Sequence, residues 1–385
     1  MPFSNIALNS KLPRVGTTIF TKMSALAQEH NAVNLSQGFP DFEVDPNLIE
    51  LVTAHMKAGS NQYAPMAGAM PLRQAIARKI EKLYNVKYNV DTEITVTAGA
   101  TQAIYTAISA IIKEGDEVII FTPAYDCYEP AIELNGGKTV FVKLKSNDYS
   151  IDWDEVRKAV SEKTKMIILN TPHNPTGTVW SEEDLKELAQ LTKGTDIILL
   201  SDEVYEHIIF QGQKHQSVLR DTLLRDRSLV VSSFGKTFHI TGWKLGYIVG
   251  PEAIMKEFRK VHQFNVFCCN HPMQQAIAEY ISVEEHYLDL GAFYEKKRDL
   301  FNQAASQSRF TILPSMGTYF QLLDYSEITD EKDVDFAIRM TKEFQLASIP
   351  VSVFYNTSND DKVLRFCFAK KNNTLERAGE ILLKI

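Results

Sequence analysis

The sequence has few cysteines, no long apolar run and no cluster of basic residues. Its 385 residues include four cysteines, of which Cys268 and Cys269 are adjacent, and no C-x-x-C pair occurs. Adjacent cysteines rarely bridge and metal-ligand spacing is missing, so we expect reduced thiols and no metal site. No apolar run reaches the roughly 20 residues of a membrane-spanning helix, and none near the N-terminus resembles a signal peptide. These features predict a soluble cytoplasmic protein without a membrane partner.

The charge balance is acidic. Lysine and arginine together number 41 against 48 aspartates and glutamates, which gives a formal net charge of -7. Binding to nucleic acid requires clustered Lys and Arg for the phosphates, so we expect no nucleic-acid partner. With 44% hydrophobic residues the composition is that of a globular protein, and the length predicts one large and one smaller domain.

Short apolar segments alternate with helical ones through the first two thirds of the chain. The strand-like segments are 93–97, 117–121, 139–144, 166–169, 197–200, 229–231 and 245–249, and the helical ones include 46–57, 71–84, 101–112, 153–160 and 182–191. Continuously apolar strands suit a sheet that is buried on both faces. Their alternation with helices predicts an α/β fold with a largely parallel sheet, whose ligands gather at the carboxyl ends of the strands.

The last third of the chain has a different pattern. Helical periodicity dominates from residue 251 to about residue 306, and a mixture of short strands and two helices follows. We therefore expect three parts: an irregular N-terminal arm (1–44) that joins the small domain, a large domain (45–275) and a small α+β domain (276–385).

Small residues follow the first predicted strand. The segment A-G-A-T-Q over 98–102 opens a helix, and its exposed backbone N–H groups would form a site for an anion such as phosphate. The alternative is that Thr101 only caps the helix.

Two further strand ends carry polar side chains. Asn174 lies in the segment N-T-P-H-N-P-T-G, whose prolines and glycine fix the backbone and so the direction of its amide. Asp202 ends a buried strand, where a carboxylate is costly unless a cation pairs with it. The alternatives are an ordinary turn at Asn174 and a structural salt bridge at Asp202.

Lys236 follows a strand in the segment S-S-F-G-K-T. Its G-K-T resembles the end of an ATPase phosphate loop, but that motif needs a glycine where Val230 stands. Lys244 adds a second cation eight residues later. These strand ends suit a ligand with a phosphate, an electrophilic carbon and a protonatable ring nitrogen. The groups that would meet it are the two lysines, the hydroxyl of Ser233, the anion site and the carboxylate of Asp202. Pyridoxal phosphate has all three.

These motifs together resemble the class I aminotransferases of the fold-type I pyridoxal-phosphate enzymes, over nearly the whole chain. The resemblance rests on 34–41, Tyr63, 98–102, 122–125, 174–177, 202–205, 233–246 and Arg365. Segments 17–20, 35–42 and 201–207 are most similar to the methionine aminotransferase and kynurenine–oxoglutarate transaminase branch. The resemblance implies a three-layer large domain with a smaller α+β domain, pyridoxal 5′-phosphate as cofactor, and an amino acid and a 2-oxo acid as substrates.

The resemblance also implies roles for single residues around the cofactor. Lys236 would bond to it and move the substrate proton, and Asp202 would pair with its ring nitrogen. Asn174 and Tyr205 would bind its 3′-oxygen, and Tyr125 would stack on its ring. The residues implied at its phosphate are Gly99, Ala100, Thr101, Ser233, Lys244 and, from the partner subunit of a homodimer with shared sites, Tyr63. Many relatives have arginine at position 244, and lysine lacks its bidentate geometry.

At the substrate, the resemblance assigns the α-carboxylate to Arg365 and to a backbone donor at Gly38, with Asn174 and Tyr125 nearby. No second arginine is marked for a side-chain carboxylate. An apolar or aromatic pocket for methionine, aromatic amino acids or kynurenine is indicated by Tyr63, Tyr125 and Ile19, with Phe20 next to Ile19.

Two other functions are alternatives to transamination. A cysteine-conjugate β-lyase needs the same lysine, aspartate and arginine, but releases pyruvate and ammonia without an oxo-acid acceptor. A transcription regulator with an aminotransferase-like domain is disfavoured, because only about thirty-three residues precede Asn34 and the charge is acidic. A ping-pong transamination remains the expected activity, with the β-lyase as its alternative.

Overall fold

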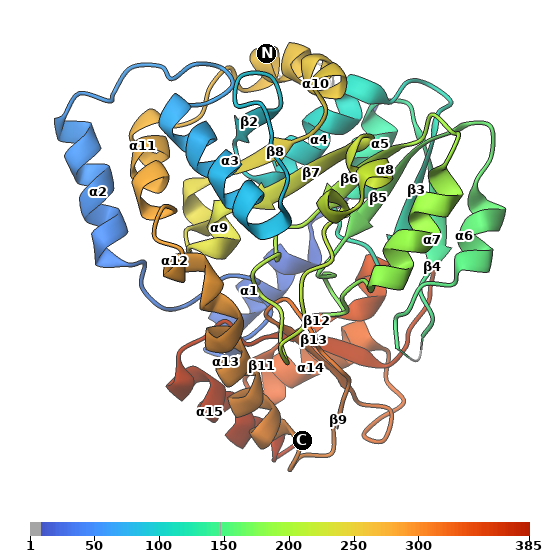
Figure 1. The fold of residues 1–385 in the computed structure, drawn as a ribbon. Coiled ribbons are helices and arrows are strands. Elements are labelled where there is room, and N and C mark those ends of the chain that lie inside the picture. The colour runs from blue at the N-terminus through green and yellow to red at the C-terminus, as the bar shows by residue number, and fades with distance from the viewer. Residues whose placement is uncertain (1–8, 147) are drawn as a thin grey trace, which may run out of the picture.

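The computed structural model describes residues 9–146 and 148–385 and is organised around a seven-stranded sheet (Figure 1). The strands, in spatial order, are β2 (Ile94–Thr97), β8 (Gly246–Val249), β7 (Ser228–Ser233), β6 (Ile198–Asp202), β5 (Thr164–Asn170), β3 (Glu117–Thr122) and β4 (Lys138–Lys143). Only β8 runs antiparallel to its neighbours within this sheet; the other pairs are parallel. The predicted, largely parallel sheet is confirmed.

Both faces of the sheet are covered, because successive side chains of a strand point to opposite faces. Leu200 and Val231 pack in one apolar layer, whereas their chain neighbours Leu199 and Val230 pack in the other. Helices α4 (Ala100–Ile111), α5 (Tyr128–Leu134) and α10 (Glu252–Asn265) contribute to the first layer. Helices α3 (Met70–Tyr84) and α7 (Glu182–Thr192) contribute to the second. The fold therefore has the three layers that the sequence resemblance implied.

The strand ends at the carboxyl edge lead directly into the polar segments. Lys236 lies in the short helix α9 (Phe234–Thr237), immediately after β7. Gly99 is the N-cap of α4 with φ +78°, so Thr101 lies inside the helix and its side chain does not cap it. Gly246 lets β8 approach closely, because a Cβ there would lie 2.5 Å from the carbonyl oxygen of Ser232. These features bring the chain segments at this edge together.

The C-terminal part forms a four-stranded antiparallel sheet in the order β12 (Ile349–Pro350), β13 (Val363–Cys367), β10 (Phe320–Asp324) and β9 (Thr311–Ile312). Its helices are α12 (Glu285–Leu288), α13 (Leu290–Ala305), α14 (Asp333–Glu343) and α15 (Asn372–Leu382). The N-terminal arm holds the helix α1 (Ile19–Glu29), which the sequence analysis did not identify. Strand β1 (Val33–Asn34) pairs with β11 (Leu346–Ala347), and Figure 1 shows α1 beside the C-terminal elements.

The two sheets suggest where the chain divides. The expected boundary at residue 275 falls inside α11 (His271–Tyr280), which packs on α2 (Pro46–Lys57) and α3. We propose that the large unit extends to the end of α11 and that the small unit begins after it, with the arm attached. In the part of the chain that the structure describes, every helix is too short or too polar to cross a bilayer.

Candidate active site

A cavity of about 140 Å³ lies at the carboxyl edge of β5, β6 and β7, beside the first turn of α4. The predicted site residues that line it are Gly99, Ala100, Thr101, Tyr125, Asn174, Asp202, Tyr205, Ser233, Lys236 and Lys244. Residues from 99 to 244 in the sequence thus meet at one place, as expected for an α/β sheet.

The amine of Lys236 lies at one side of this cavity. Its Nζ donates hydrogen bonds to the hydroxyl of Tyr319 (2.8 Å) and to the carbonyl of Gly38 (3.1 Å). Burial lowers the pKa of Lys236 to about 8, and the charge of Arg365 acts in the same direction, while Cys367 and Asp202 oppose it. With this pKa roughly a tenth of the amine is unprotonated at pH 7, and that share is able to act as a nucleophile or base.

Asp202 is almost completely buried at the end of β6. The hydroxyl of Tyr128 donates to its Oδ2 (2.6 Å), and the N–H of Val204 donates to its Oδ1 (3.3 Å). Burial raises the pKa of Asp202 to about 6, although both hydrogen bonds act to lower it. Among the described residues Asp202 forms no salt bridge, so the alternative of a structural salt bridge at Asp202 is not found. A buried carboxylate without a protein cation fits a ligand that brings its own positive charge, such as a protonated ring nitrogen.

The opposite end of the cavity is suited to an anion. Gly99 presents the first turn of α4, and a Cβ at Gly99 would lie 3.5 Å from Nζ of Lys244, so this ammonium lies close to the helix N-terminus. The hydroxyl residues Thr101 and Ser233 line the same cavity. Backbone N–H groups at a helix start, a cation and hydroxyls together form a phosphate site. The donor set therefore fits pyridoxal phosphate at both of its ends.

Arg365 extends from β13 toward the same region and is 1% exposed. Its guanidinium donates to Oδ1 of Asn174 (2.7 Å) and to the carbonyl of Ser36 (3.3 Å), while its Nε has no hydrogen-bond partner among the described residues. Burial lowers the pKa of Arg365 to about 10, which leaves it charged at neutral pH. A buried cation with an unused donor fits the α-carboxylate of a substrate.

Besides Arg365, three of the predicted residues do not line this cavity. Tyr63 is 80% exposed, and its ring lies edge-on to Phe267 with the centroids 5.1 Å apart. Ile19 lines a neighbouring cavity of about 480 Å³, together with Phe20 and with Tyr125, which lines both cavities. Gly38 directs its carbonyl oxygen, not its N–H, toward Lys236, and a Cβ there would lie 2.8 Å from the ring of Phe320.

The structure adds three residues that the sequence analysis missed. Tyr128 donates to Asp202, and Tyr319 accepts from Lys236. Asn170 donates to the carbonyl of Asp202 (3.0 Å) and accepts from the backbone N–H of Asn174 (2.9 Å). Asn170 was in a segment already singled out, whereas Tyr128 and Tyr319 have no local sequence signal, because their contacts span 74 and 83 residues.

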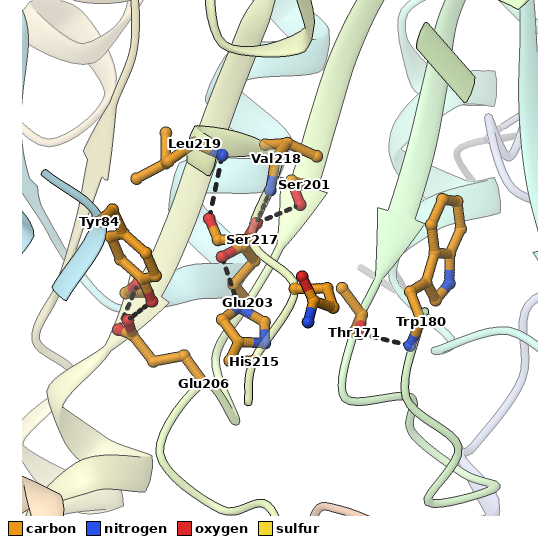
Figure 2. Close-up of polar contacts among 12 residues, drawn as sticks. Tyr84, Thr171, Trp180, Ser201, Glu203, Glu206, His215, Ser217, Val218 and Leu219 are labelled. Atoms are coloured by element: carbon orange, nitrogen blue, oxygen red, sulfur yellow. Dashed lines mark hydrogen bonds and ion pairs between the residues drawn. The ribbon is translucent and has the colours of Figure 1, made fainter. Parts of the chain in front are cut away.

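Behind the cavity, buried polar groups support the segment that follows β6 (Figure 2). Glu206 pairs with Lys79 (2.6 Å) and accepts hydrogen bonds from the hydroxyls of Tyr84 (2.9 Å) and Ser232 (2.9 Å). Burial acts to raise the pKa of Glu206, but the charge and hydrogen bond of Lys79, together with His207 and His215, outweigh it and hold the pKa well below its usual range. A buried ion pair with these added hydrogen bonds fixes the position of the chain beside Tyr205.

Glu203 forms a second such group in Figure 2. Its Oε2 lies 2.7 Å from Nε2 of His215, and its Oε1 accepts from the hydroxyl of Ser201 (2.8 Å) and from the N–H of Val218 (3.3 Å). Both Glu203 and His215 are buried. The residue next to Asp202 is therefore anchored to the loop after β6, which limits the movement of the Asp202 backbone.

Known proteins provide an independent comparison. The family model for aminotransferase class I and II matches residues 30–382. Methionine aminotransferase of Escherichia coli (strain K12) is 52% identical over 98% of each chain, and human kynurenine–oxoglutarate transaminase 3 is 35% identical over 97% of this chain and 89% of its own.

Solved structures agree in fold. An Escherichia coli structure described with a methionine aminotransferase function has a TM-score of 0.97 and 51% identity, covering 99% of this chain and all of the other. N-succinyldiaminopimelate aminotransferase from Mycobacterium tuberculosis has a TM-score of 0.94 and 33% identity, covering 98% and 100%. The family, fold and cofactor expected from the sequence are confirmed. The chain belongs to the class I and II aminotransferases, and with pyridoxal 5′-phosphate it transfers the amino group of an amino acid to a 2-oxo acid.

Proposed function

We propose that the amino donor is an L-amino acid with an apolar or aromatic side chain, such as methionine, phenylalanine, tyrosine or kynurenine, in a ping-pong reaction. The observation that carries this proposal is the neighbouring cavity that shares Tyr125 with the cofactor cavity. Its apolar lining includes Ile19, Phe20, Val353 and Phe354. The names of the methionine and kynurenine transaminases among the relatives support the same donors.

The charges in this neighbouring cavity oppose an acidic side chain. Asp126 lines it, and no arginine does so among the described residues; Lys22, at the exposed rim, is the cation there. Desolvation raises the pKa of Asp126, and the charge of Arg365 acts against that rise. The carboxylate of a glutamate or aspartate side chain would therefore approach a like charge, which disfavours dicarboxylic donors.

A panel of amino-acid donors with one fixed oxo acid tests this proposal. Asp126→Asn is expected to raise kcat/KM for glutamate relative to that for methionine by roughly tenfold, because about 1.4 kcal/mol of repulsion is removed. The matched control is Glu129→Gln: Glu129 lines the same cavity but pairs with Arg14 at 3.0 Å, so its loss is expected to leave the ratio unchanged. Aspartate as the best donor of the unaltered enzyme would contradict the proposal.

The residues of the site have separate tasks in this proposed reaction. When bound, pyridoxal phosphate supplies a ring that accepts the electron pair released as the substrate Cα–H bond breaks. Lys236 takes the proton from the substrate Cα and later returns one. Asp202 would keep the ring nitrogen protonated, Tyr205 would donate to the 3′-oxygen, and Arg365 would hold the substrate α-carboxylate bidentately. The pKa of about 8 at Lys236 suits a base that works near neutral pH.

We also propose a homodimer whose two sites are shared. Tyr63 and Phe267, whose rings are in contact, are 80% and 45% exposed, and Phe264, three residues before Phe267 in the chain, is 89% exposed. Large exposed aromatic groups of this kind mark protein contact surfaces. A second copy of the chain would cover them and would receive Tyr63 at its own phosphate site.

Mixing two defective variants tests the shared site. Tyr63→Ala is expected to weaken cofactor binding by about 10- to 100-fold, because a hydrogen bond to a phosphate is lost. In a mixed dimer with Lys236→Ala, one site contains both defects and the other contains neither. After subunit exchange, roughly a quarter of the sites are then intact, since half of the dimers are mixed and symmetric pairing gives one good site in each. No recovery of activity, or a fully active monomer in sedimentation, would refute the shared site.

We propose a cytoplasmic location, and the state of the thiols supports it. Cys127, Cys268, Cys269 and Cys367 are all free in the structure. Free, partly buried thiols are typical of a reducing compartment, which supports our proposal of a cytoplasmic enzyme.

A further inference from the structure

The amine of Lys236 is held by two groups from distant parts of the chain. Its acceptors are the carbonyl of Gly38, 198 residues away in the N-terminal arm, and the hydroxyl of Tyr319, 83 residues away beside β10. The hydroxyl of Tyr319 also donates to the same carbonyl of Gly38. The large unit, the arm and the small unit therefore meet at this one amine.

The ring of Tyr319 is fixed in position by its surroundings. It is completely buried and packs edge-on against the ring of Tyr205, with the centroids 5.1 Å apart. The preceding residue, Thr318, has φ +67°, and its N–H donates to the carbonyl of Ile208 (3.0 Å). The hydroxyl of a buried tyrosine usually has a hydrogen-bond partner, and this one contacts Lys236 and Gly38.

Both acceptors act on the amine in the same way. Hydrogen bonds to an ammonium favour its charged form, whereas burial disfavours it. The two acceptors also restrict a flexible four-carbon side chain to one position, which keeps the amine near the substrate carbon from which it takes the proton.

We propose that Tyr319 is a positioning residue of this enzyme, which together with the Gly38 carbonyl holds the amine of Lys236 while that amine is not bonded to the cofactor. The inference rests on the proposed role of Lys236 as the cofactor lysine. Tyr319 would affect the reaction only through its hydrogen bond with Lys236. The Gly38 carbonyl would have the same task, which explains why this carbonyl, rather than the N–H of Gly38, faces the amine. The alternative is that Tyr319 only fills space in the aromatic cluster around Tyr205.

Two variants separate these roles. Tyr319→Phe removes the hydroxyl that contacts Lys236. Tyr294→Phe is the matched control, because Tyr294 is also fully buried, its ring centroid lies 5.7 Å from that of Tyr319, and its hydroxyl has no partner among the described residues. If Tyr319→Phe does not fold, Tyr319→Met, which also fills the space without a hydroxyl, takes its place.

The first measurement uses the enzyme stripped of cofactor. The rate at which a small amine-reactive reagent modifies Lys236 is followed across pH, with the peptide identified by mass spectrometry. In Tyr319→Phe the midpoint of this titration is expected to fall by about one pH unit, because a hydrogen bond to the charged amine is lost. In Tyr294→Phe it is expected to stay where it is. An unchanged midpoint in Tyr319→Phe, or an equal shift in Tyr294→Phe, would overturn the proposal.

The second measurement uses the loaded enzyme. Tyr319→Phe is expected to lower kcat about tenfold with little change in the KM of the donor, since the groups that bind substrate remain. Borohydride reduction of the unaltered enzyme, followed by peptide analysis, first shows which lysine bonds the cofactor. If that lysine is not Lys236, the proposed role of Lys236 fails and this inference fails with it. If it is Lys236 and the titration is unchanged in Tyr319→Phe, only the positioning role fails.

Discussion

Lys236→Ala is expected to lower kcat by about five to six orders of magnitude, because one amine both anchors the cofactor and moves the substrate proton. The visible absorption band of the lysine-bound cofactor is expected to disappear as well. No other amine described here combines contact with Gly38 and Tyr319 with a place in the cofactor cavity. We do not expect either effect to result from unfolding. Burial makes the charged form of Lys236 costly, so replacing this side chain with alanine removes that cost from the folded state.

Turnover and absorbance are measured on the same purified variants. The control is Lys22→Ala, which removes an exposed lysine that lines the neighbouring cavity; it is expected to keep the band and to change kcat by less than about twofold. Transamination retained by Lys236→Ala would remove Lys236 from the mechanism and would leave the origin of the base open.

The layers of the fold were predictable because burial on both faces leaves a clear trace in sequence. The inner strands contain short uninterrupted apolar runs, as in the L-V-V of β7, and helices separate most of the strands. The shorter elements were not predictable in the same way. The helix α9 has only four residues and begins where β7 ends, so no periodicity can develop. The helix α1 begins at Ile19, inside the segment 17–20, which was singled out for its resemblance to known enzymes and for Ile19 as a pocket residue but not as a helix.

The site residues also fall into a group that could be predicted from the sequence and a group that could not. Residues on strand ends, such as Asp202 and Lys236, were found because the edge of a parallel sheet brings them together whatever the side-chain details. Residues whose contacts join the small unit or the arm to the large unit were not found in this way. Tyr319 contacts Lys236 only because the small unit packs against the large one, and the orientation of the Gly38 peptide depends on the ring of Phe320 beneath it. Such contacts depend on packing, which composition and spacing do not encode.

Asp202→Asn is expected to separate catalysis from stability. Asparagine keeps the shape of the side chain and can still accept from Tyr128, so the cofactor is expected to remain bound. It carries no charge to keep the ring nitrogen protonated, so we expect kcat to fall by about three to four orders of magnitude. Near-normal kcat would refute the proposed pairing of Asp202 with the ring.

Tyr128→Phe is the matched control. It removes the 2.6 Å hydrogen bond to Asp202 but leaves the charge of Asp202. Because that hydrogen bond lowers the pKa of Asp202, its loss is expected to move the acid limb of the kcat/KM profile to higher pH.

Asp202→Asn is also expected to stabilise the enzyme stripped of cofactor. The pKa of Asp202 is about 6 in the folded chain against 3.8 for an ordinary aspartate, mainly because of burial. The folded state therefore binds this proton more tightly than the unfolded state, so the contribution of Asp202 to stability is fully present below about pH 3.8 and is lost as the pH rises through about 6. Asparagine avoids that loss, and we expect it to raise the free energy of unfolding at pH 8 by on the order of 2 kcal/mol, with little gain at pH 4. Urea unfolding of both stripped proteins at the two pH values measures the difference. A variant less stable than the unaltered chain at pH 8 would show that the protein itself, and not the cofactor, compensates the buried charge.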